Sequence, residues 1–377
     1  MPDPVLDMPI PRSLVLRMDI TNTCNLDCIG CALGDTRKAL HEPAAAMKVD
    51  LFEKIANQVF PYLSEIALSC EAEPILHPQF VRIMQIIRDK TERGTNLPIR
   101  MTTNATLLSK ERLDAIFEAG LFGLTISIDG FAPETFSKIR KRGEISTVLG
   151  ALDEIVRRKS ALGRTRTDVP HLQINYTLMK STLHELIPLI EYSRRWQLDN
   201  FTVVHVYSTE TKDMRHESLA DWQEESDRVL IEAERKCREY GIIPRFPGLF
   251  RSAARVQEVP SLWERIVSRL RPNAVQSSPS PMGEPQLACS APWSMLKIRW
   301  DGSVHPCDLW NFRMPMGSLQ TQSFEEIWKC EKYIELRSGL FCGRPTFAHC
   351  LKCDRISQDN LEKRKLRSVL AHTSVTQ

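Results

Sequence analysis

The stretch SLVLRMDITNTCNLDCIGC, residues 13 to 31, places three cysteines directly after a predicted buried strand. Cys24, Cys28 and Cys31 lie close enough along the chain for their thiols to reach one common centre. A disulfide would use only two of them and would not persist in a reducing cytosol, whereas a structural zinc site takes four ligands. An iron-sulfur cluster is held by cysteine thiolates, and three of them leave one iron open to another ligand. The stretch therefore favours a cluster, with zinc and incidental packing as alternatives.

Composition indicates a cytoplasmic protein that binds neither nucleic acid nor a membrane. The 377 residues suffice for one large α/β barrel and a small appendage. The 50 basic and 47 acidic residues give a net charge of +3, which argues against polyanion binding as the main task. No apolar run approaches the roughly 20 residues of a membrane span, and the N-terminus lacks a signal-peptide pattern. The 11 cysteines cluster toward both ends of the chain, which suits metal ligation better than a disulfide framework.

Short β-branched runs alternate with amphipathic helical patterns, which indicates repeated βα units around a parallel sheet. Strands are expected at residues 14–20, 65–69, 98–103, 124–128, 172–178 and 201–206. Helices are expected at 49–60, 80–93, 109–120 and 148–161, the third of them capped by Ser109. Six such units predict an α/β fold built on a partial (β/α)6 TIM-like barrel that is open on one side.

The rhythm of the sequence changes after residue 207. A long charged helix is expected over about 217–240, and the Pro- and Ser-rich stretch 272–286 is typical of a linker. A cysteine-rich segment with its own spacing follows. The expected parts are a barrel core (1–207), a helical segment and linker (208–286), a cysteine-rich domain (287–357) and a tail (358–377).

The CxxxCxxC arrangement of Cys24, Cys28 and Cys31 resembles the signature of the radical S-adenosylmethionine (SAM) superfamily. The resemblance implies that the three thiolates hold a [4Fe-4S] cluster whose open iron chelates SAM. It also implies reductive cleavage of SAM to a 5'-deoxyadenosyl radical, which abstracts hydrogen from an unactivated C–H bond. An external electron donor of the flavodoxin or ferredoxin type is expected as a partner.

Three further segments resemble the SAM-binding motifs of this superfamily in the expected order. In LSCEAEPILHPQF (68–80), Glu73 is expected to accept hydrogen bonds from the SAM amino group, while Cys70 and Ala72 replace frequent glycines. The segments MTTNATLLS and TISIDGFAPETFSKIRKRG carry the other implied SAM contacts, which are Asn104, Ser127, Asp129 and Arg140. Ser127 and Asp129 are expected near the ribose, and Arg140 near the SAM carboxylate.

The cysteine-rich segment supplies a second set of four thiols. ACSAPWSMLKIRWDGSVHPC and HCLKC provide the pairs Cys289 with Cys307 and Cys350 with Cys353. Four thiolates suffice for one more [4Fe-4S] cluster, with zinc as the alternative. The pattern resembles a SPASM domain in its shortened twitch form, with a β-hairpin around an Asp-Gly turn at Gly302 and a helix within 317–337. One auxiliary cluster is therefore expected, and two [4Fe-4S] clusters in all.

Enzymes with such tails modify peptides, or oxidise or epimerise aminocyclitols and sugars. Many peptide modifiers carry a leader-binding domain before the barrel. Because the first strand is expected from residue 14, no such domain fits here. A carbohydrate or aminocyclitol substrate is therefore expected, with peptide modification by crosslinking or epimerisation as the alternative. A protein that merely carries clusters is a third possibility, against which the SAM motifs argue.

The reaction is expected to be an epimerisation or a dehydrogenation. Epimerisation needs a hydrogen-atom donor, for which Cys342 and Cys70 rank above Cys237 and Cys330; most unassigned cysteines are simply packed. Dehydrogenation would instead pass an electron to the auxiliary cluster. Polar side chains on the later strands could hold substrate hydroxyls: Asn175, Tyr176, His205 and Tyr207. His205 is more readily explained as a core histidine.

Overall fold

The computed structural model describes residues 9–68, 71–91, 97–165, 168–208, 212–250, 289–310, 312–351 and 353. The strands are β1 (Leu14–Met18), β2 (Asp27–Cys28), β3 (Leu63–Leu68), β4 (Ile99–Thr103), β5 (Gly123–Ser127), β6 (Arg140–Lys141), β7 (His171–Leu178), β8 (Asn200–His205), β9 (Ile243–Arg245), β10 (Met295–Ile298), β11 (Ser303–His305) and β12 (Gly317–Ser318). The helices are α1 (Leu33–Leu40), α2 (Val49–Val59), α3 (Phe80–Thr91), α4 (Lys110–Glu118), α5 (Pro133–Ile139), α6 (Ile145–Ala161), α7 (Leu186–Ser193), α8 (Gln223–Glu239), α11 (Ala291–Ser294), α12 (Phe324–Trp328), α13 (Glu331–Phe341) and α14 (Ala348–Leu351).

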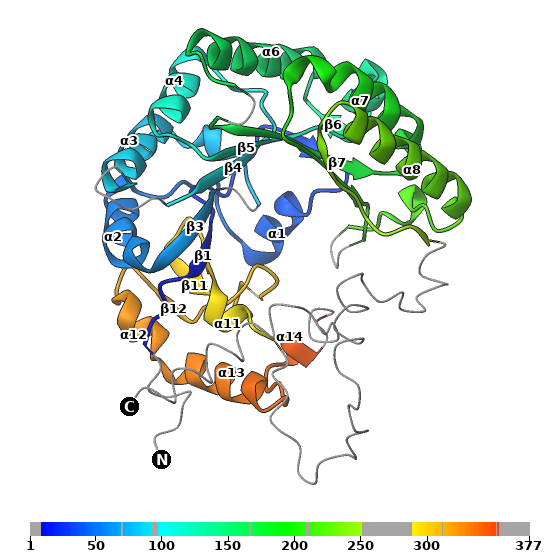
Figure 1. Ribbon diagram of the computed structural model, residues 1–377. Coiled ribbons are helices and arrows are strands. Elements are labelled where there is room, and N and C mark those ends of the chain that lie inside the picture. Colours follow the sequence, from blue (N-terminus) through cyan, green and yellow to red (C-terminus); the bar gives the residue numbers. More distant parts are fainter. Residues whose placement is uncertain are drawn as a thin grey trace, which may run out of the picture.

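Six parallel strands form the predicted open barrel. The main sheet has the order β12-β11-β10-β1-β3-β4-β5-β7-β8-β9, and its central strands from β1 to β8 run parallel. Helices α2, α3, α4, α6 and α7 cover the outer face of the curved sheet, while α1 lies on its inner side (Figure 1). Alternate residues of β1 (Leu14, Leu16 and Met18) are fully buried in the core. The predicted α/β partial barrel is confirmed, with strand bounds that differ from the expected ones by one or two residues.

The cysteine-rich domain extends the barrel sheet directly. Strand β10 pairs in parallel with β1, where Leu16 lies opposite Leu296, and the expected hairpin pairs β10 with β11 around the turn at Gly302. The helix expected within 317–337 is present as two helices, α12 and α13, which follow the short strand β12. Ser323 begins α12 with a capping box, and Cys330 is the N-cap of α13, so the chain starts a new helix there.

Other expectations after residue 207 are met in part. The charged helix α8 starts at Gln223, later than expected, and the segment after it adds a parallel strand, β9, to the sheet edge beside β8. Pro244 fits there because the edge position leaves no ladder hydrogen bond for it to donate. The linker at 272–286 and the tail at 358–377 lie outside the described residues. None of the described helices has the length and apolar character needed to cross a membrane.

Gly302 allows the tight turn of the hairpin. Its φ angle is +78°, and an added Cβ would lie 3.2 Å from the Leu51 side chain of α2. Gly302→Ala is therefore expected to lower the free energy of unfolding by about 1–2 kcal/mol, measured by chemical denaturation. Gly150→Ala is the control, because that position lies within α6 with open space around it, and the substitution is expected to stabilise the protein by about 0.5–1 kcal/mol. Equal stability of the two variants would contradict the role of the turn.

Candidate active site

A cavity of about 410 Å³ opens at the carboxyl ends of the barrel strands, where barrels of this kind build their sites. The residues that line it include all three cysteines of the first motif and all five expected SAM contacts, namely Cys24, Cys28, Cys31, Glu73, Asn104, Ser127, Asp129 and Arg140. Residues that are more than 100 positions apart in the sequence therefore meet on one surface.

The cysteine loop is fixed to the barrel by a short two-stranded ribbon. Strand β2 pairs antiparallel with β6, so that Cys28 lies opposite Arg140, and the Ile29 N–H donates to the Ile139 carbonyl at 2.9 Å. This ribbon was not predicted, because two-residue strands leave no periodic signal in the sequence. It places a guanidinium beside the cysteine loop.

The thiols are suited to metal binding. Backbone N–H groups of Leu26 and Leu33 approach the sulfurs of Cys24 and Cys31 at 3.4 and 3.5 Å. Burial raises the pKa of Cys28 to about 12, although the nearby Arg140 cation opposes this. A buried thiol of this kind is protonated near neutral pH unless a metal takes the proton's place, since coordination deprotonates a thiol outright. The loop thus offers three thiols, two of them with N–H donors, which fits a cluster-binding site.

Glu73 is held rigidly at the floor of the cavity. Its carboxylate accepts hydrogen bonds from the Thr103 hydroxyl at 2.7 Å and from the backbone N–H groups of Asn104 and Ile75 at 2.8 and 3.3 Å. Burial is the main reason why the pKa of Glu73 is raised, against the lowering effect of these donors. An ionised carboxylate has about four acceptor sites. One site therefore remains for the amino group that the family resemblance expects there.

Asp129 and Arg140 form a buried ion pair. The Arg140 Nη2 lies 2.7 Å from the Asp129 Oδ2, and the Thr177 N–H donates to the other carboxylate oxygen at 2.6 Å. The Nε of Arg140 is buried without a hydrogen-bond acceptor in the described part of the chain. Arg140 as a residue lines the cavity, which fits the carboxylate of SAM as the partner expected for it.

Asn104 and Ser127 complete the expected set. The Asn104 amide donates to Asn25 at 3.0 Å and approaches the sulfur of Cys24 at 3.7 Å, so it ties the cysteine loop to β4. Ser127 ends β5 and lines the cavity. The structure thus gives Asn104 a second task, orienting a thiol, that the sequence did not indicate.

The four cysteines of the C-terminal domain form a second group. Cys289 and Cys350 lie close enough to Cys307 for their charges to raise its pKa, and Cys289 and Cys353 do the same for Cys350. Burial raises the pKa of Cys307 to about 12 and that of Cys350 to about 11. Within the described ranges, no three Cys, His, Asp or Glu side chains converge as ligands of a single metal ion would. Four cysteines in one group are the number that a [4Fe-4S] cluster or a zinc site takes.

The remaining cysteines lie away from the cavity as far as the structure describes them. Cys342 is exposed at the C-terminal end of α13, Cys237 is buried in α8, and Cys330 precedes α13. None of these three lines the cavity. Cys70 lies outside the described residues.

Of the polar candidates on the later strands, Asn175 and Tyr207 line the cavity, together with Thr177. Tyr176 faces the core, where its hydroxyl donates to the Thr182 carbonyl at 2.8 Å. His205 is half-buried against Phe250, with its ring centroid 5.0 Å away, and does not line the cavity. Sequence reasoning missed Glu71, which also lines the cavity and contacts Lys297 of β10. The sequence did hold one signal of this contact, because Lys297 lies between apolar residues of a buried strand and so needs a buried acidic partner.

The sequence matches two family patterns. The pattern of the radical SAM superfamily matches residues 18–186, and that of the SPASM iron-sulfur cluster-binding domain matches residues 289–354. Two proteins of Methanosarcina barkeri are similar over most of their length. An Fe-coproporphyrin III synthase is 22% identical over 94% of this chain and 83% of its own. An AdoMet-dependent heme synthase is 27% identical over 86% of this chain and 84% of its own.

Solved structures show the same fold. Streptococcus suis SuiB bound to S-adenosylmethionine has a TM-score of 0.63 at 16% identity and covers 92% of this chain and 71% of its own. The enzyme anSMEcpe with bound AdoMet has a TM-score of 0.57 at 17% identity and covers 91% of this chain and 88% of its own. The radical SAM pattern spans the first group of cysteines (Cys24, Cys28 and Cys31), and the SPASM pattern spans the second group (Cys289, Cys307, Cys350 and Cys353). The chain belongs to the radical SAM superfamily and carries a C-terminal SPASM domain.

Proposed function

We propose that this protein is a radical SAM oxidoreductase that dehydrogenates a small polyhydroxylated substrate of the carbohydrate or aminocyclitol class. The observation that carries the proposal is the single cavity in which three cysteines, Glu73 and the Asp129–Arg140 pair meet the polar ends of β7 and β8. Cys24, Cys28 and Cys31 would hold the SAM-binding [4Fe-4S] cluster. Cys289, Cys307, Cys350 and Cys353 would hold one auxiliary [4Fe-4S] cluster.

The bound cofactors would supply the 5'-deoxyadenosyl radical and a site for one electron. The chain's own residues would bind and orient SAM and the substrate. Glu73 has an acceptor site for the SAM amino group, and Arg140 lines the cavity with a cation for its carboxylate. Asn175 and Tyr207 offer amide and hydroxyl groups to substrate hydroxyls at the open end of the cavity. A flavodoxin or ferredoxin-type protein would deliver the electron.

Dehydrogenation is favoured over epimerisation by the positions of the thiols. A hydrogen-atom donor has to touch the substrate carbon, but Cys342 is exposed at the end of α13 and does not line the cavity. Cys237 and Cys330 do not line it either. Cys70 stays a candidate donor because it precedes Glu71, a residue of the cavity wall. Its test is Cys70→Ala, which should leave a dehydrogenase unchanged and abolish an epimerase.

A tetrapyrrole substrate is the second candidate. It is favoured by the two relatives named for haem and coproporphyrin synthesis, each of which matches this chain over more than four-fifths of both lengths. Peptide modification is the third candidate, and the experiment below also tests it. The likeness to SuiB supports only the fold.

Anaerobic turnover in deuterated water with SAM and reductant tests the proposal. Three substrate pools are compared: polyols (myo-inositol, glucosamine and scyllo-inosamine), tetrapyrroles, and precursor-type peptides. We expect 5'-deoxyadenosine above the uncoupled background only with the polyol pool, and a product that has lost two hydrogen atoms. Replacement of one hydrogen by one deuterium, a mass gain of one with no new double bond, would mean epimerisation. Stimulation only by tetrapyrroles or only by peptides would overturn the substrate class.

A further inference from the structure

Three carboxylates line the cavity in the part of the chain that is described: Glu71, Glu73 and Asp129. Glu73 already accepts three hydrogen bonds from the protein, and Asp129 is paired with Arg140 and with the Thr177 N–H. Glu71 differs because its side chain keeps about a fifth of its surface exposed, at 21%. It is therefore the carboxylate with room to meet a substrate.

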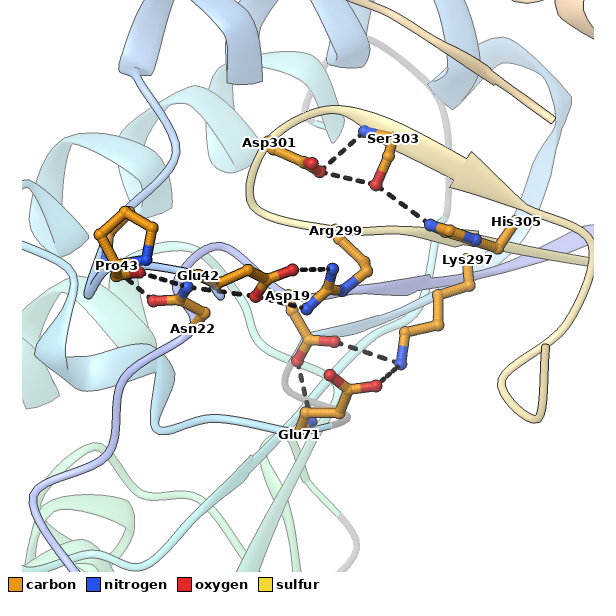
Figure 2. Close-up of polar contacts among 11 residues, drawn as sticks. Asp19, Asn22, Glu42, Pro43, Glu71, Lys297, Arg299, Asp301, Ser303 and His305 are labelled. Atoms are coloured by element: carbon orange, nitrogen blue, oxygen red, sulfur yellow. Dashed lines mark hydrogen bonds and ion pairs between the residues drawn. The ribbon is translucent and has the colours of Figure 1, made fainter. Parts of the chain in front are cut away.

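Glu71 stands where the barrel meets the SPASM domain. Figure 2 shows Lys297, from β10, pointing toward both Glu71 and Asp19. The ammonium group of Lys297 contacts the Glu71 carboxylate directly and lies 3.5 Å from the Asp19 Oδ2, and the lysine is only 1% exposed. The Glu71 backbone N–H donates to the Asp19 Oδ1 at 2.9 Å. These contacts fix the position of Glu71 from both domains.

The charges around Glu71 suit a group that takes up a proton. Asp19 and Glu71 share the one ammonium of Lys297, while Arg299, the next cation along the chain, is engaged by Glu42 at 2.5 and 2.9 Å. Lys297 also lies over the Phe312 ring, 4.5 Å from its centroid. Burial raises the pKa of Glu71, Asp19 adds to this effect, and Lys297 and Arg299 oppose it. Two carboxylates beside one cation bind a proton more readily than an isolated ion pair does.

We propose that Glu71 is the proton acceptor of the dehydrogenation and that Lys297 sets its proton affinity; the inference rests on the proposed function. In the step, the substrate carbon first loses a hydrogen atom to the 5'-deoxyadenosyl radical. The hydroxyl or amine on that carbon then gives its proton to a Glu71 carboxylate oxygen, and one electron leaves for an iron-sulfur cluster. A C=O or C=N bond forms as the O–H or N–H bond breaks. The substrate thus loses two hydrogens in total, one as an atom and one as a proton plus an electron.

Glu71→Gln tests the acceptor, because the amide keeps the shape but cannot take the proton. With the polyol pool, we expect product formation to fall about 100-fold or more, while substrate-dependent 5'-deoxyadenosine persists. An organic substrate radical should accumulate in the electron paramagnetic resonance spectrum of the variant. Glu71→Asp should restore part of the product. Glu65→Gln, on β3 before Glu71 in the chain and paired with Arg100 outside the cavity, is the matched control and should behave as the wild type.

Lys297→Met tests the second half of the proposal through pH. Glu71 has to be ionised to accept a proton, so product formation is lost as the pH falls through its pKa. Removing the ammonium raises that pKa, since Lys297 lowers it in the wild type. The acid limb of the pH profile should therefore move to higher pH in Lys297→Met and stay in place in Glu65→Gln.

The outcomes separate the two proposals. Undiminished product from Glu71→Gln, or an unmoved acid limb in Lys297→Met, overturns the role of Glu71 and leaves the proposed function intact. Loss of 5'-deoxyadenosine and product together in Glu71→Gln also overturns it, because an acceptor acts only after hydrogen abstraction. A wild-type enzyme that makes no dehydrogenated product from the polyol pool overturns both.

Discussion

Replacing Cys24, Cys28 and Cys31 together with alanine is expected to halve the iron content of the anaerobically reconstituted protein. The chain offers two separate thiol groups, so removing the first should leave one cluster and reduce about eight iron atoms to about four. Reductive cleavage of SAM should fall to the background, because the iron that chelates it is gone. Iron and acid-labile sulfide analysis with 5'-deoxyadenosine quantification gives both readouts.

Two control variants make this result specific. Replacing Cys289, Cys307, Cys350 and Cys353 with alanine should also leave one cluster, but that protein should still cleave SAM. Cys237→Ala, buried in α8 away from the cavity, should keep both clusters and full cleavage. An unchanged iron content in the triple variant would contradict the assignment of the first motif.

Arg140→Met is expected to cost about 3 kcal/mol or more of folding free energy. The substitution leaves the Asp129 carboxylate buried without its cation, and an uncompensated buried charge is strongly destabilising. It also removes the guanidinium that lines the cavity and is expected to contact the SAM carboxylate, so SAM affinity should fall about tenfold, the usual effect of losing one hydrogen bond to a charged group. Anaerobic chemical denaturation and titration calorimetry with SAM measure the two effects.

The double variant Asp129→Asn with Arg140→Met separates the charge effect from the packing effect. It should be more stable than Arg140→Met alone, since no unpaired charge remains, yet it should bind SAM no more tightly than that variant does. Arg142→Met, two positions on and exposed, is the matched control for loss of an arginine and should resemble the wild type in both measurements. Full stability and full SAM affinity of Arg140→Met would rule out both roles of the pair.

The sequence was sufficient for the features that depend on local pattern. Six strands, the hairpin at Gly302 and two cysteine groups were predicted because periodicity, turn residues and spacing are visible within short windows. The inward face of each strand was harder to predict. Both faces of a parallel strand are covered, so the alternation on β7 did not reveal that Asn175 faces the cavity and Tyr176 the core.

What could not be predicted depends on contacts between distant segments. The ribbon that sets Cys28 opposite Arg140 joins two strands of two residues each, which have no signature of their own. The contact between Glu71 and Lys297 spans 226 positions and depends on β10 pairing with β1. The exposed position of Cys342 likewise follows from where α13 ends. Such features follow from the assembled fold and not from local preference.

The pairing of β10 with β1 determines whether the barrel can be separated from the SPASM domain. Because the SPASM hairpin continues the barrel sheet, cutting the chain before β10 would turn β1 into a bare edge with unpaired backbone groups. Such an edge invites aggregation, so the barrel is not a module that can be excised and studied alone. The hydrogen bonds between β10 and β1 also prevent the two domains from moving independently. A substitution that shifts one of these two strands therefore has to be accommodated by the other.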